Sequence, residues 1–215
     1  MKKIILVTLG IFVCSLSVSA ALNWSYGWED GTGTALGKYE GTAGLAMINS
    51  DEQAQEGTRS LKLVEDPLSG TPQAYIWWVT GLSSGDVVTA SFYCYDTVPG
   101  GNPSGRIWAH YTGSSTDVND YTGSAGGSDT YSAGTGWNSL TNTWIFNDNN
   151  GANTGLVVEA RIYSSAAPAN VLYYDTTYIT VSRDTAVIHR ADGATVPEPA
   201  LFGLAALALI FFRTR

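Results

Sequence analysis

The feature that most constrains this chain is an alternation of apolar and other side chains, with a period of two, in several short segments. In residues 87–95, one set of alternate positions is small and apolar, and it consists of Val88, Ala90, Phe92 and Cys94. The intervening positions carry mostly aromatic and polar side chains. Because successive side chains of a β-strand point to opposite faces, this pattern predicts a strand with one face in a core.

Similar short segments recur along the chain and are separated by clusters of Gly, Asn, Asp and Ser. We expect strands over residues 22–29, 60–64, 75–79, 87–95, 106–111, 137–140, 143–146, 156–163 and 171–181. The stretch 112–136 has too little apolar content for a core. We therefore expect one all-β domain over residues 21–183, a jelly-roll β-sandwich of two antiparallel sheets. Residues 184–195 are expected to form a polar linker.

The alternation also separates core positions from positions on the opposite strand face. We expect Trp137 and Trp144 in the core, and at most one of Trp77 and Trp78, which are adjacent and point to opposite faces. The other face is expected to form an aromatic wall that can contact a ligand. Its candidate residues are Tyr93, Tyr95, Trp108, His110 and Tyr163, with Arg106, Glu159 and Arg161 nearby.

Charge and cysteine content argue against a nucleic-acid-binding protein and against a fold stabilised by disulfides. The net charge of −8 argues against a nucleic-acid partner, because phosphate binding requires a basic surface. The chain has two cysteines, and Cys14 lies in the amino-terminal segment, so Cys94 is expected to be a buried small side chain without a disulfide partner.

The amino-terminal segment has the features of a secretory signal peptide. Lys2 and Lys3 precede an apolar stretch over residues 4–13, and small residues follow up to Ala20. We therefore expect residues 1–20 to direct export and to be removed after Ala20 or Ala21.

The carboxyl-terminal segment combines three features in a fixed order. Pro197, Glu198 and Pro199 precede an apolar run over residues 200–212, and a basic cluster, 213–215, ends the chain. Residues 196–215 resemble the PEP-CTERM sorting signal. This resemblance implies export to a bacterial cell envelope, cell surface or extracellular matrix, with an exosortase-type enzyme as partner. The alternative is an ordinary membrane anchor formed by a short transmembrane helix of about 20 Å. Both alternatives imply membrane contact.

A second resemblance covers most of the central domain. The motifs that carry it are Trp28-Glu29-Asp30-Gly31, residues 56–63 and 81–86, the aromatic spacing over 137–146, and Tyr173-Tyr174-Asp175. In this order they resemble jelly-roll carbohydrate-binding modules of the galactose-binding-domain-like fold. The resemblance implies polysaccharide binding through aromatic rings. It also implies a structural calcium ion held by Glu29 or Asp30 together with Asp175.

These observations favour a non-catalytic exported protein that binds polysaccharide. The only two histidines are His110 and His189, and no Gly-x-Ser-x-Gly elbow, zinc-type histidine pair or phosphate loop is present. An alternative is a structural or adhesive matrix component that binds no glycan. A glycoside hydrolase is a third class, which would need two carboxylates on opposite sides of a cleft.

Overall fold

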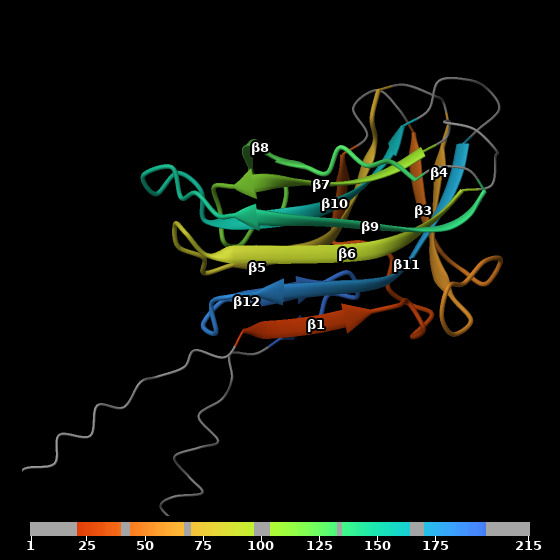
Figure 1. The fold of residues 1–215 in the computed structure, drawn as a ribbon, viewed down its shortest axis with the longest axis horizontal. Coiled ribbons are helices and arrows are strands. Elements are labelled where there is room, and N and C mark those ends of the chain that lie inside the picture. Colours follow the sequence, from red (N-terminus) through yellow and green to blue (C-terminus); the bar gives the residue numbers. More distant parts are fainter. Residues whose placement is uncertain are drawn as a thin grey trace, which may run out of the picture.

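The structure is a computed structural model that describes residues 21–39, 44–66, 70–96, 104–132, 135–163 and 170–196. The signal segment 1–20 and residues 197–215 of the sorting segment, including Pro197, Glu198 and Pro199, lie outside the described residues. Within the described residues, all regular secondary structure consists of β-strands, and the strands form two antiparallel sheets (Figure 1). The predicted fold class is confirmed. No helix in this part of the chain has the length and apolarity that a membrane span requires.

The first sheet, here called sheet A, has the strand order β3-β4-β11-β6-β9, with β1 paired to β11 as well. Its strands are β1 (Leu22–Tyr26), β3 (Leu45–Ser50), β4 (Ser60–Glu65), β6 (Val87–Asp96), β9 (Gly136–Ile145) and β11 (Asn170–Val181). β4 pairs with the first half of β11 and β1 with the second half, along the same side of β11. The register of β11 is shifted between these two halves, at Asp175.

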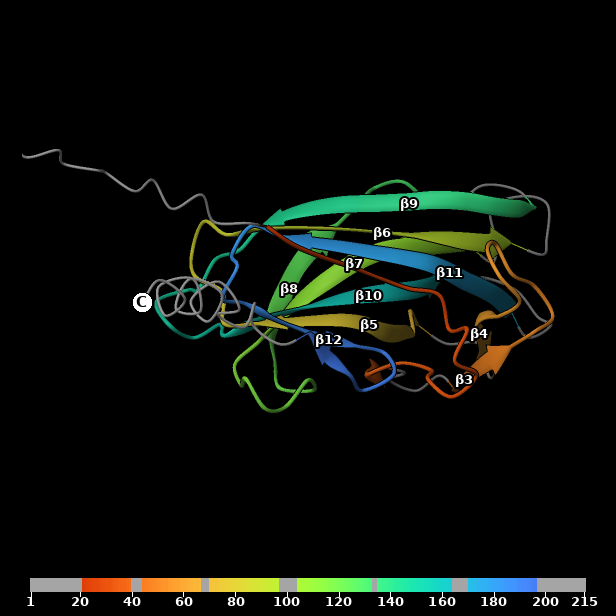
Figure 2. The ribbon, with the colours of Figure 1, turned by 90° about the horizontal axis from the view of Figure 1, so that it is seen from below.

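The second sheet, sheet B, has the strand order β13-β12-β5-β10-β7-β8, with β2 paired to β5 as well. Its strands are β2 (Gly37–Tyr39), β5 (Gln73–Thr80), β7 (Ser104–Thr112), β8 (Tyr121–Gly127), β10 (Gly155–Tyr163), β12 (Val187–Arg190) and β13 (Thr195–Val196). Seen at right angles to the first view, the sheets form two layers (Figure 2). Sheet B therefore has an inner face toward sheet A and an outer face away from it.

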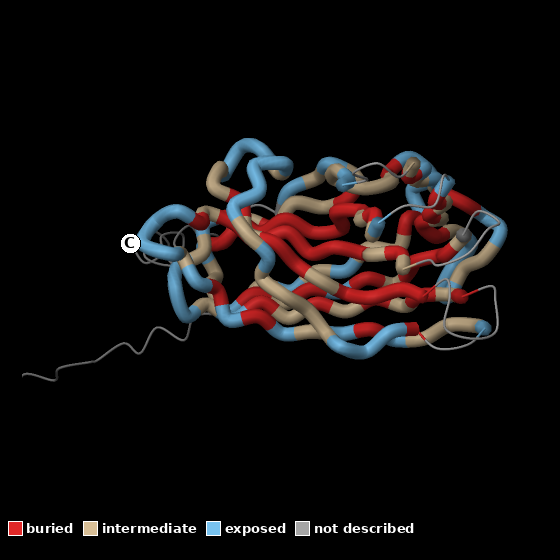
Figure 3. The backbone as a smooth tube through the Cα atoms, turned by 90° about the horizontal axis from the view of Figure 1, so that it is seen from above, coloured by how far each residue is buried: buried red, intermediate tan, exposed pale blue. Residues whose placement is uncertain are grey.

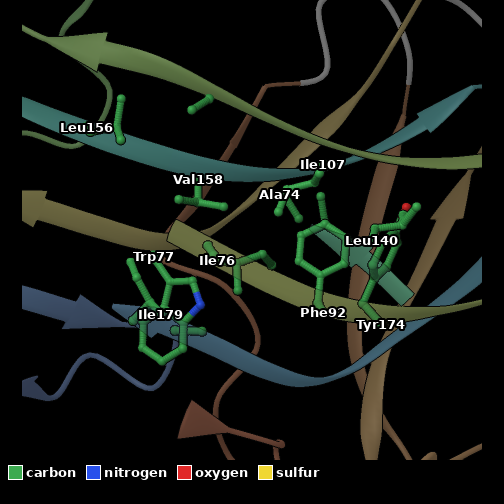
Figure 4. Packing of buried hydrophobic residues seen from close by; sticks show 14 of the residues in the cluster. Ala74, Ile76, Trp77, Phe92, Ile107, Leu140, Leu156, Val158, Tyr174 and Ile179 are labelled. Carbon is green, nitrogen blue, oxygen red and sulfur yellow. The ribbon is translucent and has the colours of Figure 1, made fainter. Parts of the chain in front are cut away.

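The core fills the space between the two inner faces. The alternate positions that the sequence assigned to the core are buried, among them Phe92 of β6, Ile107 of β7 and Val158 of β10. Side chains from both sheets meet there (Figure 4), and the buried backbone runs through the centre of the molecule with exposed connections around it (Figure 3). Cys94 is fully buried, and burial raises the pKa of its thiol to about 12. It is the buried thiol that the sequence predicts.

A bulge in β5 changes which side chains reach the core. The pairing with β10 shifts between Val158 and Glu159, so Val158 is opposite Trp77 and Glu159 is opposite Tyr75. The extra residue, Ile76, faces the core, and so does Trp77 next to it. Tyr75 and Trp78 belong to a separate apolar cluster on the outer face. The expectation for Trp77 and Trp78 is confirmed, since only Trp77 lies in the main core.

Several elements differ from the sequence-based expectation. Residues 136–145 form the single strand β9, not two strands, because their whole length pairs with β6. Residues 187–190, expected within a linker, form β12, which pairs with β5 beside β2. The sandwich therefore extends to residue 196. Ile188 supplies a fully buried side chain to the core, which is the physical reason that this segment joins the sheet.

Candidate functional site

The five residues of the predicted aromatic wall lie on two different surfaces. Tyr93 and Tyr95 belong to β6 and face outward from sheet A. Trp108 and His110 belong to β7 and Tyr163 to β10, on the outer face of sheet B. The alternation correctly identifies positions outside the core. The five residues do not form one wall, because a sandwich has two outer faces and the pattern of a strand does not specify to which face the strand contributes.

On sheet A, the aromatic side chains form a row across neighbouring strands. Trp137 of β9 is opposite Tyr95, and Tyr95 is opposite Tyr173 of β11. The ring centroids of Tyr95 lie 5.2 Å from Trp137 and 6.1 Å from Tyr173, both in edge-to-face geometry. The hydroxyl of Tyr173 donates to Oε2 of Glu52 at 2.6 Å. These rings are largely engaged with one another.

Trp137 was expected in the core, and this expectation is wrong. Trp137 and Leu140 are three residues apart in one strand, so their side chains point to opposite faces. Leu140 and Trp144 are buried in the core, whereas Trp137 is half-buried beside Tyr95.

The outer face of sheet B contains a cavity of about 600 Å³. Its floor comes from β5, β7 and β10, and its sides come from β2, β8 and the segment between β7 and β8. Its described lining consists of Lys38, Tyr39, Gln73, Tyr75, His110, Asn119, Tyr121 and Arg161. The segment between β7 and β8 projects beyond sheet B on the side away from sheet A (Figure 2). The volume lies within the range of ligand pockets.

Two tyrosines at the sides of this cavity are accessible to a ligand. Tyr39 of β2 is 55% exposed and Tyr121 of β8 is 61% exposed. Tyr75 is buried in the floor, where burial and the nearby Glu159 carboxylate raise its pKa. Gly37 allows β2 to approach this floor, since a Cβ at that position would lie 2.8 Å from the Tyr75 ring and 3.2 Å from Oδ1 of Asn119.

A buried ion network supports the floor. Oε1 of Glu159 lies 2.5 Å from Nδ1 of His110, and Nε of Arg161 donates to Oε2 at 2.7 Å. In the amide orientation that satisfies both of its ends, Gln73 donates to both oxygens of Glu159 and accepts from Nη2 of Arg161 at 3.1 Å. Glu159 and His110 are each 1% exposed. Glu159 and Arg161 form an ion pair, and His110 belongs to the same network.

Trp108 and Tyr163 lie beside the cavity lining. The Trp108 ring packs against the guanidinium groups of Arg106 and Arg161, whose central carbons lie 4.3 and 4.6 Å from its centroid. Tyr163 packs edge-to-face against Tyr131 at 5.1 Å, and its hydroxyl accepts a long contact of 3.5 Å from Nη1 of Arg161. Their positions indicate a supporting role: they hold the arginines that flank or line the cavity.

The other end of this face is closed by apolar packing. Tyr75, Trp78 and Val157 form a small cluster, against which Leu36 and Val118 pack. The ring of His189 stacks on Trp78 with centroids 4.4 Å apart, and burial lowers the pKa of His189. This cluster limits the length of the cavity along the strands.

The three proposed calcium ligands lie together in another place. Glu29, Asp30 and Asp175 line a cavity of about 580 Å³ between the start of the domain and β11. The resemblance to carbohydrate-binding modules implied that these residues are close in space, and they are.

Their carboxylates, however, are already bonded to donors of the protein. Asp175 accepts from the backbone N–H groups of Gln55 at 2.7 Å and Glu56 at 3.1 Å. Burial raises its pKa, and these N–H groups oppose the rise. Burial is the largest single effect on Glu29 and opposes ionisation, but the backbone N–H groups of Arg59 and Thr58, the Thr58 hydroxyl and the charge of Arg59 together lower the pKa of Glu29.

Asp30 is engaged in the same way, since Oδ1 accepts from the N–H groups of Thr32 at 2.9 Å and Gly33 at 3.1 Å. Within the described ranges, no group of three or more His, Cys, Asp or Glu side chains is arranged to hold a metal ion. The described carboxylates are not arranged as a calcium site. Calcium stays a prediction of the resemblance.

Sequence reasoning missed most of the cavity lining. Tyr39 lies in a three-residue strand that was not expected, and Asn119 and Tyr121 lie in the polar stretch 112–136. An isolated tyrosine among Gly, Ser and Thr is the one signal that the sequence offered, since it marks an aromatic ring with no local core to enter. That signal does not say which strand lies opposite.

No protein-family model matches the chain, and no curated protein matches it significantly in sequence. Solved structures of carbohydrate-binding modules resemble its β-sandwich fold. One is a module of the β-sandwich superfamily studied for promiscuous specificity, with 18% identity and a TM-score of 0.49. The match covers 71% of this chain and 59% of that chain, so this protein spans less than two thirds of that structure.

A second is the CBM22-1 xylan-binding domain of Paenibacillus barcinonensis Xyn10C, with 16% identity, a TM-score of 0.47 and coverage of 77% of this chain and 97% of that one. A third is the K1 cleaved adhesin domain of Lys-gingipain from Porphyromonas gingivalis W83. It has 12% identity, a TM-score of 0.42 and coverage of 74% and 97%. At these identities the likeness concerns the fold, and the ligands belong to those proteins.

Proposed function

We propose that this protein is an exported, non-catalytic binding protein that holds polysaccharide in the cavity on the outer face of sheet B. The observation that carries the proposal is the lining of that cavity, in which tyrosine rings alternate with amide, imidazole and cationic groups. Sugar rings have apolar C–H faces and polar hydroxyl edges. A concave surface with exposed aromatic rings and a few fixed polar groups suits both.

The arrangement of carboxylates supports binding over hydrolysis. Glycoside hydrolysis ordinarily uses two carboxyl groups on opposite sides of the bond that is cleaved. Glu159 lies under the floor, and both of its oxygens accept hydrogen bonds from the protein. Among the described lining residues there is no Asp or Glu that could be the second group.

The site proposal is tested by removing one exposed ring. In affinity electrophoresis of the purified protein through polysaccharide gels, Tyr121→Ala is expected to weaken retardation about tenfold, which equals about 1.4 kcal/mol. The matched control is Tyr178→Ala, which removes a 43% exposed ring on sheet A and should leave binding unchanged. If the unaltered protein is not retarded by any polysaccharide, the alternative of a structural or adhesive matrix component is favoured.

Export and sorting are part of the same proposal and depend on the terminal segments alone. Removal of residues 1–20 and processing of the 196–215 segment by an exosortase-type enzyme would release the domain from the membrane. The intact mass of the secreted protein is expected to lack the residues after Pro199. A mass that includes Arg215, recovered from the membrane fraction, would support the membrane-anchor alternative.

A further inference from the structure

The charge of the cavity on sheet B differs from that of the protein. The chain has a net charge of −8, and the cavity at β1 and β11 is lined by Glu29, Asp30, Glu56 and Asp175 with a single arginine, Arg190. In contrast, the described lining of the cavity on sheet B contains Lys38 and Arg161 and no carboxylate. The described lining of the cavity on sheet B therefore adds no negative charge of its own, on a protein that is acidic as a whole.

The geometry around Arg161 leaves part of its guanidinium group available. The Glu159 carboxylate below it contacts His110 and Gln73 as well, so Arg161 is only one of its three partners. Arg161 uses Nε for Glu159, one N–H of Nη2 for Gln73 and one N–H of Nη1 for the long 3.5 Å contact with the Tyr163 hydroxyl, which leaves one N–H on each terminal nitrogen; its side chain is 15% exposed. A guanidinium carries five N–H donors, and here it is held against the Trp108 ring before any ligand arrives.

His110 contributes a further unpartnered atom. It lines the cavity with its Nδ1 fixed on Glu159, and its Nε2 is buried without a hydrogen-bond partner among the described residues. A buried polar atom without a hydrogen-bond partner lowers stability unless a ligand or a water molecule supplies the hydrogen bond. This nitrogen accepts from a sugar hydroxyl when the ring is neutral and donates to an anion when the ring is protonated.

Resting on the polysaccharide-binding function proposed above, we propose that this cavity selects glycans that carry carboxylates, such as uronic acid residues, with the guanidinium group of Arg161 donating to the carboxylate. Arginine matches the planar shape of a carboxylate and can donate two parallel hydrogen bonds to it.

The test compares each acidic polymer with its own neutral form. Polygalacturonate, alginate and glucuronoxylan are used as they are and after reduction of their carboxylates to primary alcohols. The full chain is expected to bind at least one acidic polymer at least tenfold more tightly than its reduced form. Equal or tighter binding to the reduced forms overturns the selectivity and leaves the binding function standing. No binding to any of the six polymers overturns the proposed function itself.

A charge-inserting variant locates the selectivity. Asn119→Asp adds one carboxylate to the lining at an exposed position, and it should weaken binding of the acidic polymer about tenfold more than binding of the reduced polymer. Ser139→Asp adds the same charge on the outer face of sheet A and serves as the control. Because Arg161→Gln alters a buried network and can unfold the protein, Asn119→Asp carries the test. Equal loss for both polymers, or an equal effect of Ser139→Asp, overturns the assignment.

Discussion

The outer faces of the two sheets start from the same kind of sequence and form different surfaces. Both carry aromatic and polar residues at alternate strand positions. On sheet A, the rings of Trp137, Tyr95 and Tyr173 are neighbours in register and pack edge-to-face. On sheet B, the exposed rings of Tyr39 and Tyr121 lie on different outlying strands, with a cavity between them.

The difference shows that a cavity depends on the elements around a sheet. Sheet B has β2, β8 and the segment between β7 and β8 beside its central strands. On sheet A, the segment after β3 lies over β11 instead, where Gln55 and Glu56 donate to the buried carboxylate of Asp175. The residue after it, Thr176, has a φ of 47°, which is unusual for a β-branched side chain. The segment after β3 thus packs on β11 at Asp175, whereas β2, β8 and the segment between β7 and β8 enclose a cavity over the central strands of sheet B.

The largest expected effect concerns the ion network under the cavity. Glu159→Ala leaves His110 and Arg161 without their common acceptor in a buried environment, which should cost about 3–5 kcal/mol of unfolding free energy. Urea denaturation measures the loss. On sheet A, Glu52→Ala removes the acceptor of the Lys62 ammonium and of the Tyr173 hydroxyl, each at 2.6 Å. The Glu52 side chain is 55% exposed, so the loss should be far smaller. Similar losses for the two variants would contradict the contrast.

The second prediction concerns the aromatic row of sheet A. Tyr95→Ala and Trp137→Ala should each lower stability, and a double-mutant cycle should give a coupling of about 0.5–1.5 kcal/mol from their edge-to-face contact. Neither variant should change polysaccharide affinity. Tyr121→Ala should do the reverse, lowering affinity while changing stability by no more than about 0.5 kcal/mol. A loss of affinity in Tyr95→Ala would move the binding surface to sheet A.

A smaller effect is expected at the closed end of sheet B, where His189 stacks on Trp78. Burial lowers the pKa of His189, so the unfolded chain takes up a proton more readily than the folded protein. Its contribution to stability is therefore present above the unfolded pKa of about 6.5 and is lost as the pH falls below it. Urea denaturation at several pH values should show a smaller acid loss for His189→Gln. Identical pH dependence in both proteins would refute this reading.

The smallest expected effect is that of a chelator on the melting temperature. The carboxylates of Glu29, Asp30 and Asp175 already accept hydrogen bonds from backbone N–H groups and need no calcium ion as a partner. EDTA should therefore leave the melting temperature unchanged. A calcium ion present at 100 times its dissociation constant would stabilise the fold by about 2.7 kcal/mol. A clear drop with EDTA that added calcium reverses would establish the calcium site.

The core could be predicted from the sequence to a large extent. Val88, Ala90 and Phe92 were assigned correctly because a strand has a fixed period of two. The assignment failed at Trp137, which lies an odd number of residues from both Leu140 and Trp144 in the single strand β9 and therefore points to the other face. The pattern also could not foresee the bulge at Ile76, since a register shift depends on the partner strand β10.

The sequence by itself determined that this chain forms a β-sandwich and which alternate positions of strands such as β6 enter its core, because alternation and apolar burial are local properties. Only the tertiary structure decided that Tyr95 and His110 lie on opposite sides and that Tyr39 and Tyr121 enclose one cavity. Those relations depend on which strands become neighbours. Strand pairing joins residues far apart in the chain, and no local pattern records it.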